Sequence, residues 1–278
     1  MPDSHSYPLA LVVSTHRSKF AAVSHVGDVD ARAAELAAIG FDGVELAIRD
    51  PALVDADELV ELLARYHLAV PAIGTGQAYI EEGLLLTSAS AQTRRAALER
   101  VLSHLPFAAR VNAIVIVGLI GLASTDGQSV ERATDHLVAG LREIAAAAAT
   151  AGVRVAVEPV NRYESDLVRT VADGMRVVSA VGAENVGLLL DTFHMNIEEV
   201  SISDSIRQSG ERLFHFHVAD SNRWYPGAGH TDFSPIIDAL DDLGYAGFLS
   251  GEFLPQPNPT EAARHFYEHM TTQVRSGA

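Results

Sequence analysis

Short apolar runs alternate with longer amphipathic segments from one end of the chain to the other. Each run is rich in Val, Ile, Leu or Ala and is bounded by glycine or polar residues, which is typical of strands buried on both faces. We predict eight strands: Leu9–Ser14, Gly43–Ile48, Ala69–Gly74, Ala113–Gly118, Val153–Glu158, Val186–Asp191, Leu213–Ala219 and Gly247–Phe253. Runs of this kind indicate a parallel sheet that is covered on its outer face.

Segments with helical periodicity follow each of these runs. The predicted helices are Asp28–Ile39, Asp55–Tyr66, Ala91–Val111, Val130–Thr150, Val171–Val181, Ser203–Arg212, Ser234–Leu243 and Thr260–Val274. Gly40 and Gly244 follow two of them as C-caps, and Ser234 is an N-cap before Pro235 at the first helical position. Eight strand–helix pairs without a linker predict one α/β domain, a single (β/α)8 TIM barrel over residues 1–278.

The composition narrows the classes of protein that the chain can represent. Its 278 residues, 48% of them hydrophobic, are enough for one (β/α)8 barrel with a substantial core. The formal net charge of −16 disfavours nucleic acid and anionic membrane surfaces as partners. No apolar window is long enough to span a membrane and MPDSHSYPLALVV lacks the features of a secretory signal, so we expect a cytoplasmic protein.

Two residue counts limit the chemistry that is available. The chain has no cysteine, which excludes thiol nucleophiles and Cys–Zn sites. Lys19 is the single lysine and lies in a polar stretch beyond the first predicted strand, so imine catalysis is hard to place here.

Each of the last four predicted strands ends in a residue that can bind a divalent metal. These residues are Glu158, Asp191, His217 and Glu252. The carboxyl ends of the strands in a TIM barrel meet at one mouth, where catalytic groups gather. Pro159 holds Glu158 extended at its strand end, because the residue before proline avoids the α conformation. Three carboxylates and one imidazole suit one hard or borderline ion such as Mn²⁺, Mg²⁺ or Co²⁺.

Two further polar residues lie inside predicted strands. His215 and His217 are two positions apart and share a face, so His215 lies one layer deeper, and we expect it to be a hydrogen-bonded core histidine. Glu45 lies in the apolar run GVELAI, where a charge needs a partner. It either orients a ligand histidine or forms a structural ion pair.

Three residues in the loops after the ligand-bearing strands are candidates for substrate contacts: Glu164, His194 and Arg223. The longest loop, TGQAYIEEGLLLTSAS, follows the third predicted strand and is a candidate lid or specificity wall. The last loop, LPQPNPTEA, lacks the glycines with which barrels often bind phosphate, so a non-phosphorylated substrate is expected.

Several motifs, in order along the chain, resemble those of the D-tagatose 3-epimerase family, which are ketose 3-epimerases with xylose-isomerase-like barrels. The motifs are EPVNRYE (158–164), LLDTFHMNIEE (189–199), FHFHVADSNRWYPGAGHTDF (214–233) and GEF (251–253). The N-terminal runs VELAIRDP (44–51), AIGTGQAYIEEGLLLT (72–87) and IVIVGLIG (114–121) are most similar to the 5-keto-L-gluconate epimerase branch.

The resemblance implies an activity and roles for these residues. Glu158, Asp191, His217 and Glu252 would bind one metal ion, usually Mn²⁺. Glu158 and Glu252 would also be the two catalytic carboxylates, which invert carbon 3 of a ketose or keto-sugar acid through an enediolate.

The resemblance further implies that Glu164, His194 and Arg223 contact the sugar or sugar-acid substrate. Alternatively, Arg223 or Arg49 would pair with a substrate carboxylate, as a keto-acid sugar requires. A homodimer or homotetramer is usual in the family.

Other activities remain open at this stage. An aldose–ketose isomerase of the hydroxypyruvate or xylose isomerase type would use the same metal site and move a proton between carbons 1 and 2. An inosose dehydratase and an inactive sugar-binding barrel are further alternatives. An abasic-site nuclease on the same fold is disfavoured, because it needs several zinc ions, more histidines and a basic groove.

Overall fold

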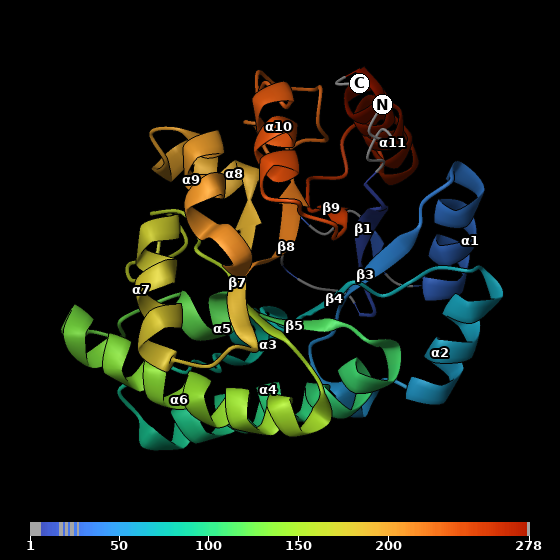
Figure 1. The fold of residues 1–278 in the computed structure, drawn as a ribbon. Coiled ribbons are helices and arrows are strands. Elements are labelled where there is room, and N and C mark those ends of the chain that lie inside the picture. Colours follow the sequence, from blue (N-terminus) through green and yellow to red (C-terminus); the bar gives the residue numbers. More distant parts are fainter. Residues whose placement is uncertain (1–6, 17–18, 20–21, 23–24, 27, 277–278) are drawn as a thin grey trace.

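The computed structural model describes residues 7–16, 19, 22, 25–26 and 28–276, and its strands form a closed parallel barrel (Figure 1). The barrel strands follow one another in chain order: β1 (Leu9–Ser14), β3 (Gly43–Ala47), β4 (Ala72–Gly74), β5 (Ile114–Val117), β6 (Val155–Val157), β7 (Val186–Asp191), β8 (Leu213–Val218) and β9 (Leu249–Gly251). Pairing of β1 with β9 closes the ring, and the short β2 (His25–Val26) pairs with the carboxyl end of β1. The predicted TIM barrel is confirmed.

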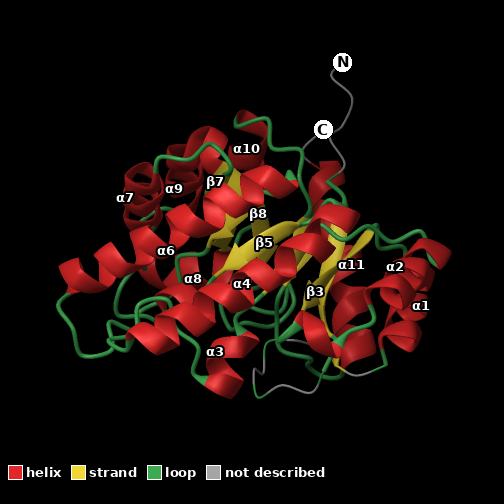
Figure 2. Ribbon diagram, turned by 90° about the horizontal axis from the view of Figure 1, so that it is seen from below, coloured by secondary structure: helices red, strands yellow, loops and turns green. Residues whose placement is uncertain are grey.

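Helices surround the barrel on the outside, as Figure 2 shows. The eight predicted helices are present as α1 (Val29–Ile39), α2 (Ala56–Arg65), α4 (Ala91–Val111), α6 (Val130–Ala151), α7 (Val171–Val181), α9 (Ile202–Ser209), α10 (Ser234–Asp242) and α11 (Pro259–Ser276). None of the described helices is both long and apolar enough to cross a bilayer.

The differences from the predicted elements are local. Strand β6 ends at Val157, the last residue that pairs with its neighbours. The prediction extended it to Glu158, which follows the apolar run. Helix α9 ends at Ser209, and the segment Gly210–Arg212, predicted as helix, is a separate 3₁₀ turn. Helix α10 begins at Ser234 itself, so Phe233 is the N-cap and Ser234 is not. Apolar composition marks burial, whereas an element ends where its backbone hydrogen bonds end.

Three short helices begin within three residues of the ends of barrel strands and were not predicted. They are α3 (Gln77–Glu82) after β4, α5 (Leu119–Leu122) after β5 and α8 (Thr192–Glu198) after β7. Each is too short to reveal its helical period in the sequence. All three lie at the carboxyl ends of barrel strands, and this is where the fold builds the rim of its candidate site.

Alternation along the strands separates two cores. Outward-facing apolar residues pack against the helices in one large cluster. Inward-facing residues fill the barrel with a small cluster made of Ala72, Ile114, Ile116, Ala156 and Leu189. Since successive side chains point to opposite faces of a strand, the next inward position lies two residues further on. After Ala156 and Leu189 that next position is a carboxylate, Glu158 and Asp191, so the apolar filling gives way to charge at the mouth.

Candidate active site

The predicted ligands lie at the carboxyl ends of four neighbouring strands: Asp191 and His217 are within β7 and β8, and Glu158 and Glu252 directly follow β6 and β9. Glu158 lies two residues after Ala156, and Asp191 two residues after Leu189. Asp191 is paired in register with His217, and His217 in turn with Ser250 of β9, two residues before Glu252. The barrel geometry therefore brings together side chains that are far apart in the sequence.

One ligand atom from each of Glu158, Asp191, His217 and Glu252 lies within 4.8 Å of the others. The first three residues are buried, and Glu252 is only partly exposed. The structure thus gathers all four predicted ligands around one point. Three acidic oxygens and one imidazole nitrogen are a donor set that suits Mn²⁺, Mg²⁺ or Co²⁺.

Two atoms of this group test whether the residues fit an ion. Asp191 Oδ1 accepts the backbone N–H of Phe193 at 2.7 Å and caps α8, whereas the buried Oδ2 has no hydrogen-bond partner among the described residues. His217 Nε2 bonds Glu45, whereas the buried Nδ1 has none either. His217 Nδ1 is 3.9 Å from Glu158 Oε1 and 4.0 Å from Glu252 Oε2. Buried polar atoms are normally satisfied, so these two orphans fit a shared cation.

The electrostatics of the protein alone also favour a cation. Burial, together with the charge of Glu252, raises the pKa of Glu158 well above its usual value. Burial raises the pKa of Glu252 to about 7, although His217 and Arg223 oppose it. Burial would lower the pKa of His217, but Glu45 and the nearby Glu252 and Glu158 raise it to about 10. The folded protein crowds negative charge here, and a divalent ion would compensate it.

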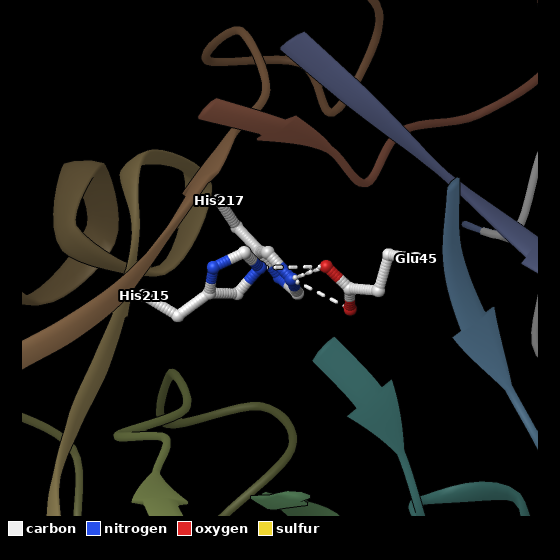
Figure 3. A group of neighbouring side chains, drawn as sticks. All are labelled: Glu45, His215 and His217. Atoms are coloured by element: carbon white, nitrogen blue, oxygen red, sulfur yellow. Dashed lines mark hydrogen bonds and ion pairs between the residues drawn. The ribbon is translucent and has the colours of Figure 1, made fainter. Parts of the chain in front are cut away.

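Glu45 joins the two histidines of β8, as Figure 3 shows. His215 Nε2 lies 2.7 Å from Glu45 Oε2, and His217 Nε2 lies 2.9 Å from Oε1 and 3.0 Å from Oε2. All three residues are buried. Burial would raise the pKa of Glu45, but the charges of His217 and His215 and their hydrogen bonds lower it below its usual range. The carboxylate therefore stays ionised and accepts from both rings.

This contact determines which nitrogen of His217 faces the acidic group. With its proton on Nε2, directed at Glu45, the ring presents Nδ1 to the other three ligand candidates. Both interpretations of Glu45 thus apply, since it orients His217 and is ion-paired. His215 lies deeper and is a buried, hydrogen-bonded core histidine, as predicted.

His194 is held in a defined tautomer by Asn161. The backbone N–H of Asn161 points to His194 Nδ1 at 3.3 Å, and its side-chain Nδ2 lies 2.7 Å from the same atom. A backbone N–H can only donate, so Nδ1 accepts and the proton is on Nε2. Burial, with the charges of Arg223 and His217, lowers the pKa of His194 well below its usual value. Neutral His194 therefore offers an N–H donor 3.8 Å from Glu158 Oε1.

Arg223 links two acidic residues of the site. Its Nη1 donates to Glu164 Oε1 at 2.7 Å and its Nη2 to Glu252 Oε2 at 3.1 Å. The guanidinium also lies over the ring of Phe193, 4.7 Å from its centroid. Glu164, His194 and Arg223 all line the cavity that contains Glu158, His217 and Glu252, so the predicted substrate contacts share one space with the predicted ligands.

A buried carboxylate that the sequence analysis missed holds the Arg223 loop. Asp220 is fully buried and accepts the backbone N–H groups of Ser221, Gly227 and Thr231 at 2.7, 2.8 and 3.0 Å. Burial would raise the pKa of Asp220, but these backbone donors lower it. The backbone of Arg223 within this loop has a φ of 60°, which is uncommon for a residue with a side chain. Asp220 thus keeps the loop in the conformation that directs Arg223 inward.

Gly118 is a second residue that the sequence analysis did not single out. A Cβ atom at this position would lie 2.5 Å from Glu158 Oε2, so the carboxylate occupies the space of a missing side chain.

The predicted pairing of Arg49 with a substrate carboxylate is not supported. Arg49 pairs with Glu82 at 3.5 Å and is not among the described residues that line the cavity. The motif around Asn161 and Asp220 was recognised, but only tertiary contacts reveal what these two residues bind.

Comparisons with known proteins point to one family. The family described as xylose isomerase-like TIM barrel matches residues 33–271, which include all four ligand candidates. An L-ribulose 3-epimerase from Mesorhizobium japonicum is 32% identical over 244 residues, covering 86% of this chain and 80% of the relative. Another from Methylomonas sp. is 30% identical over 214 residues, 77% and 74% of the two chains. A solved L-ribulose 3-epimerase aligns with a TM-score of 0.84 at 26% identity, over 98% and 96%.

Replacement of Glu45 tests the orientation of His217. In Glu45→Gln the amide oxygen can accept from one imidazole only, while its NH₂ group faces the other ring. We expect affinity for Mn²⁺ to fall about 10- to 100-fold with the fold retained. Titration calorimetry with Mn²⁺, beside circular dichroism, measures both. Exposed Glu61→Gln is the matched control, and an unchanged metal affinity in Glu45→Gln would contradict the orienting role.

The raised pKa values predict how the stability of the metal-free protein depends on pH. Glu252, with a pKa raised from 4.5 to about 7, and His217, raised from 6.5 to about 10, hold protons more tightly when folded. Each group stabilises the fold fully at pH values below its ordinary pKa. This contribution is lost as pH rises through the pKa that the same group has in the folded protein. The buried, neutral His194, whose pKa is lowered, acts in the opposite direction only below its ordinary pKa of 6.5. We therefore expect the Tm of metal-free protein to fall between about pH 7 and about pH 10.

Added Mn²⁺ should reverse this loss, because binding displaces the same protons. At about 100 times its Kd the ion would stabilise the fold by about 2.7 kcal/mol. The increase in Tm over chelator-treated protein should grow with pH, as measured by thermal unfolding. A gain that is absent, or that shrinks as pH rises, would count against the metal centre.

Proposed function

The chain belongs to the ketose 3-epimerases of the xylose isomerase-like TIM-barrel family, and we propose that it inverts carbon 3 of a non-phosphorylated ketose at the site described above. The observation that carries the proposal is the pair of orphaned buried atoms, Asp191 Oδ2 and His217 Nδ1, beside Glu158 and Glu252. This arrangement suits a divalent ion with two carboxylates next to it.

Inversion at carbon 3 requires removal of a weakly acidic proton next to the carbonyl at carbon 2, and return of a proton to the opposite face. Glu158 follows β6 and Glu252 follows β9, three strands further around the barrel, so the two carboxylates approach the centre from different sides. One removes the proton, giving an enediolate, and the other protonates the opposite face. A pKa near neutrality, such as that of Glu252, suits a group that both accepts and donates a proton.

The remaining residues of the site would hold the substrate. A divalent ion bound by the four ligands would supply Lewis-acid stabilisation of negative charge on the substrate oxygens. His194 offers its Nε2–H group to a substrate oxygen, since Asn161 fixes its other nitrogen as an acceptor. Arg223 directs its guanidinium between Glu164 and Glu252, and it holds Glu252 in position while facing the cavity.

The described lining favours a neutral sugar over a sugar acid. Among the described residues that line the cavity, Arg223 is the one arginine, and its guanidinium is already bound to Glu164 and Glu252. Arg49, the other candidate partner for a substrate carboxylate, is paired with Glu82. The proposed substrate is therefore a neutral ketose, and 5-keto-L-gluconate is the keto-sugar acid against which it is tested.

Three further properties complete the proposal. Manganese is the proposed ion, with Mg²⁺ or Co²⁺ as substitutes, because all three suit mixed oxygen and imidazole donors. The proposed assembly is a homodimer or homotetramer, which light scattering would measure. The proposed location is the cytoplasm, in keeping with a reaction on a small, free sugar.

Proton exchange with solvent tests the reaction. Wild-type protein with Mn²⁺ in D₂O should place deuterium at carbon 3 of a neutral ketose as its epimer appears in the NMR spectrum. Glu158→Gln and Glu252→Gln should each lower kcat by about 10²- to 10⁴-fold, because each loses an acid/base group. Circular dichroism and metal analysis separate this loss from unfolding or loss of the ion, and exposed Glu131→Gln is the control.

The same spectra discriminate between the candidate reactions. Deuterium at carbon 1 or 2 with an aldose product would replace epimerisation by aldose–ketose isomerisation. Turnover of 5-keto-L-gluconate alone, from a panel of ketoses and keto-uronates, would replace the neutral ketose by a sugar acid. Undiminished epimerisation by either glutamine variant would remove the two-carboxylate scheme.

A further inference from the structure

The cavity has one charged half and one largely apolar half. Apart from Glu45 of β3, which is paired with two histidines, the charged groups come from β6 to β9 and the loops that follow them. The other half comes from β1, β3, β4 and β5 and the segments after them, and its apolar side chains are Val12, Ala47, Ile80, Ile116 and Leu119. In the closed strand order β4 lies opposite β8, which carries His217. The segment after β4 therefore faces the metal ligands from across the cavity.

Gln77 places a polar group on this apolar wall. It is the first residue of α3, three positions after the end of β4, lines the cavity and is only 4% exposed. The other polar side chains of this half are committed, since Thr75 donates its hydroxyl to the carbonyl of Ile116 at 2.7 Å and Glu45 binds two histidines. A buried amide on an apolar wall costs free energy unless it finds partners.

Ser14 determines which way the amide of Gln77 points. The Ser14 hydroxyl is fully buried at the end of β1 and donates to the carbonyl of His16 at 2.5 Å. Its proton is thereby used, so Ser14 Oγ can only accept from Gln77, and the amide atom 2.7 Å away is Nε2. The carbonyl Oε1 of Gln77 is left as an acceptor, and within the described part of the chain nothing donates to it.

We propose that Gln77 Oε1 accepts a hydrogen bond from a substrate hydroxyl beyond the carbon that is inverted, and so selects among ketoses. The inference rests on the proposed function. A ketose with carbons 1 to 3 near Glu158, His194 and Glu252 extends its remaining carbons toward the opposite wall. Gln77 Oε1 lies there among apolar side chains. A sugar without the matching hydroxyl leaves that acceptor buried and unpaired, and this penalty is the source of selectivity.

Gln77 also links α3 to β1, so its contact with Ser14 could stabilise the fold without contacting any ligand. The two roles differ in what they do to different sugars. A purely structural role affects all ketoses equally, whereas a hydrogen bond to one hydroxyl disappears together with that hydroxyl. The decisive experiment therefore combines changes in the protein with changes in the sugar.

The protein variant is Gln77→Met, which keeps the length of the side chain and removes the amide. The substrates are the best neutral ketohexose and its 4-, 5- and 6-deoxy analogues. Loss of one buried hydrogen bond should lower kcat/KM of Gln77→Met for the full ketose by about 10- to 100-fold. One deoxy analogue should already be slowed by a similar factor in wild-type protein and should lose little more in the variant.

Two further variants keep the interpretation clear. Gln92→Met makes the same change at an exposed position of α4 and should leave all four sugars unaffected. Ser14→Ala releases Nε2 of Gln77, so the amide can rotate, and discrimination between the full and the deoxy sugar should decline while turnover of the deoxy sugar is kept. An equal loss on every sugar in Gln77→Met would overturn the inference and leave the epimerase proposal standing.

A binding measurement separates this inference from the proposed function. If wild-type protein binds ketoses in calorimetry but does not epimerise them, the proposed function fails and the same comparison of variants and sugars is made on Kd. A coupling between Gln77 and one hydroxyl in Kd would then support the inference alone. If no ketose binds or reacts, both proposals are overturned together.

Discussion

The constraint on which the site depends is the burial of four carboxylates, Glu45, Glu158, Asp191 and Glu252, around one imidazole. Burial penalises each ionised group, so the arrangement is stable only where protons, hydrogen bonds or a cation compensate the charge. Glu45 is compensated by the two histidines, and Asp191 partly by the N-terminus of α8. Glu158 and Glu252 take on raised pKa values instead. When these two carboxyl groups ionise, their charge is only partly compensated by the protein, which makes the site suited to a divalent ion.

The barrel supplies the precision that such a site needs. Inward positions of neighbouring strands lie side by side in fixed register, so Asp191 and His217 are neighbours whatever the loops do. The loops then add groups that the strands cannot reach. Asp220 gathers backbone N–H groups of its own loop and directs Arg223 inward, and Asn161 fixes the tautomer of His194. Rigid strands carry the ligand candidates, and braced loops carry the groups that would face the sugar.

The two halves of the cavity have different physical tasks. The charged half, from β6 to β9, would handle the proton and the oxygens near it, and electrostatics dominate there. The half that includes Ile80 and Leu119 excludes water and offers little polar contact, so a single fixed acceptor such as Gln77 Oε1 has a large influence. Under the proposed function, separation of this kind would let one catalytic arrangement serve sugars of different shape, because the wall could change without disturbing the ligand candidates.

The pattern of apolar runs by itself predicted the barrel, its strand order and the four residues at the strand ends. Buried strands and the helices between them are both visible in the local sequence pattern, and their regular alternation implies parallel strands. Only the tertiary structure determined which side-chain atoms contact one another. Glu45 and His217 are 172 positions apart, and no local pattern indicates that one carboxylate serves both histidines of β8. The short helices α3, α5 and α8 escaped detection because one or two turns carry no period. Ser14 and Gln77, like Asp220 and the backbone it binds, acquire their roles through hydrogen-bond directions, which exist only once the chain has folded.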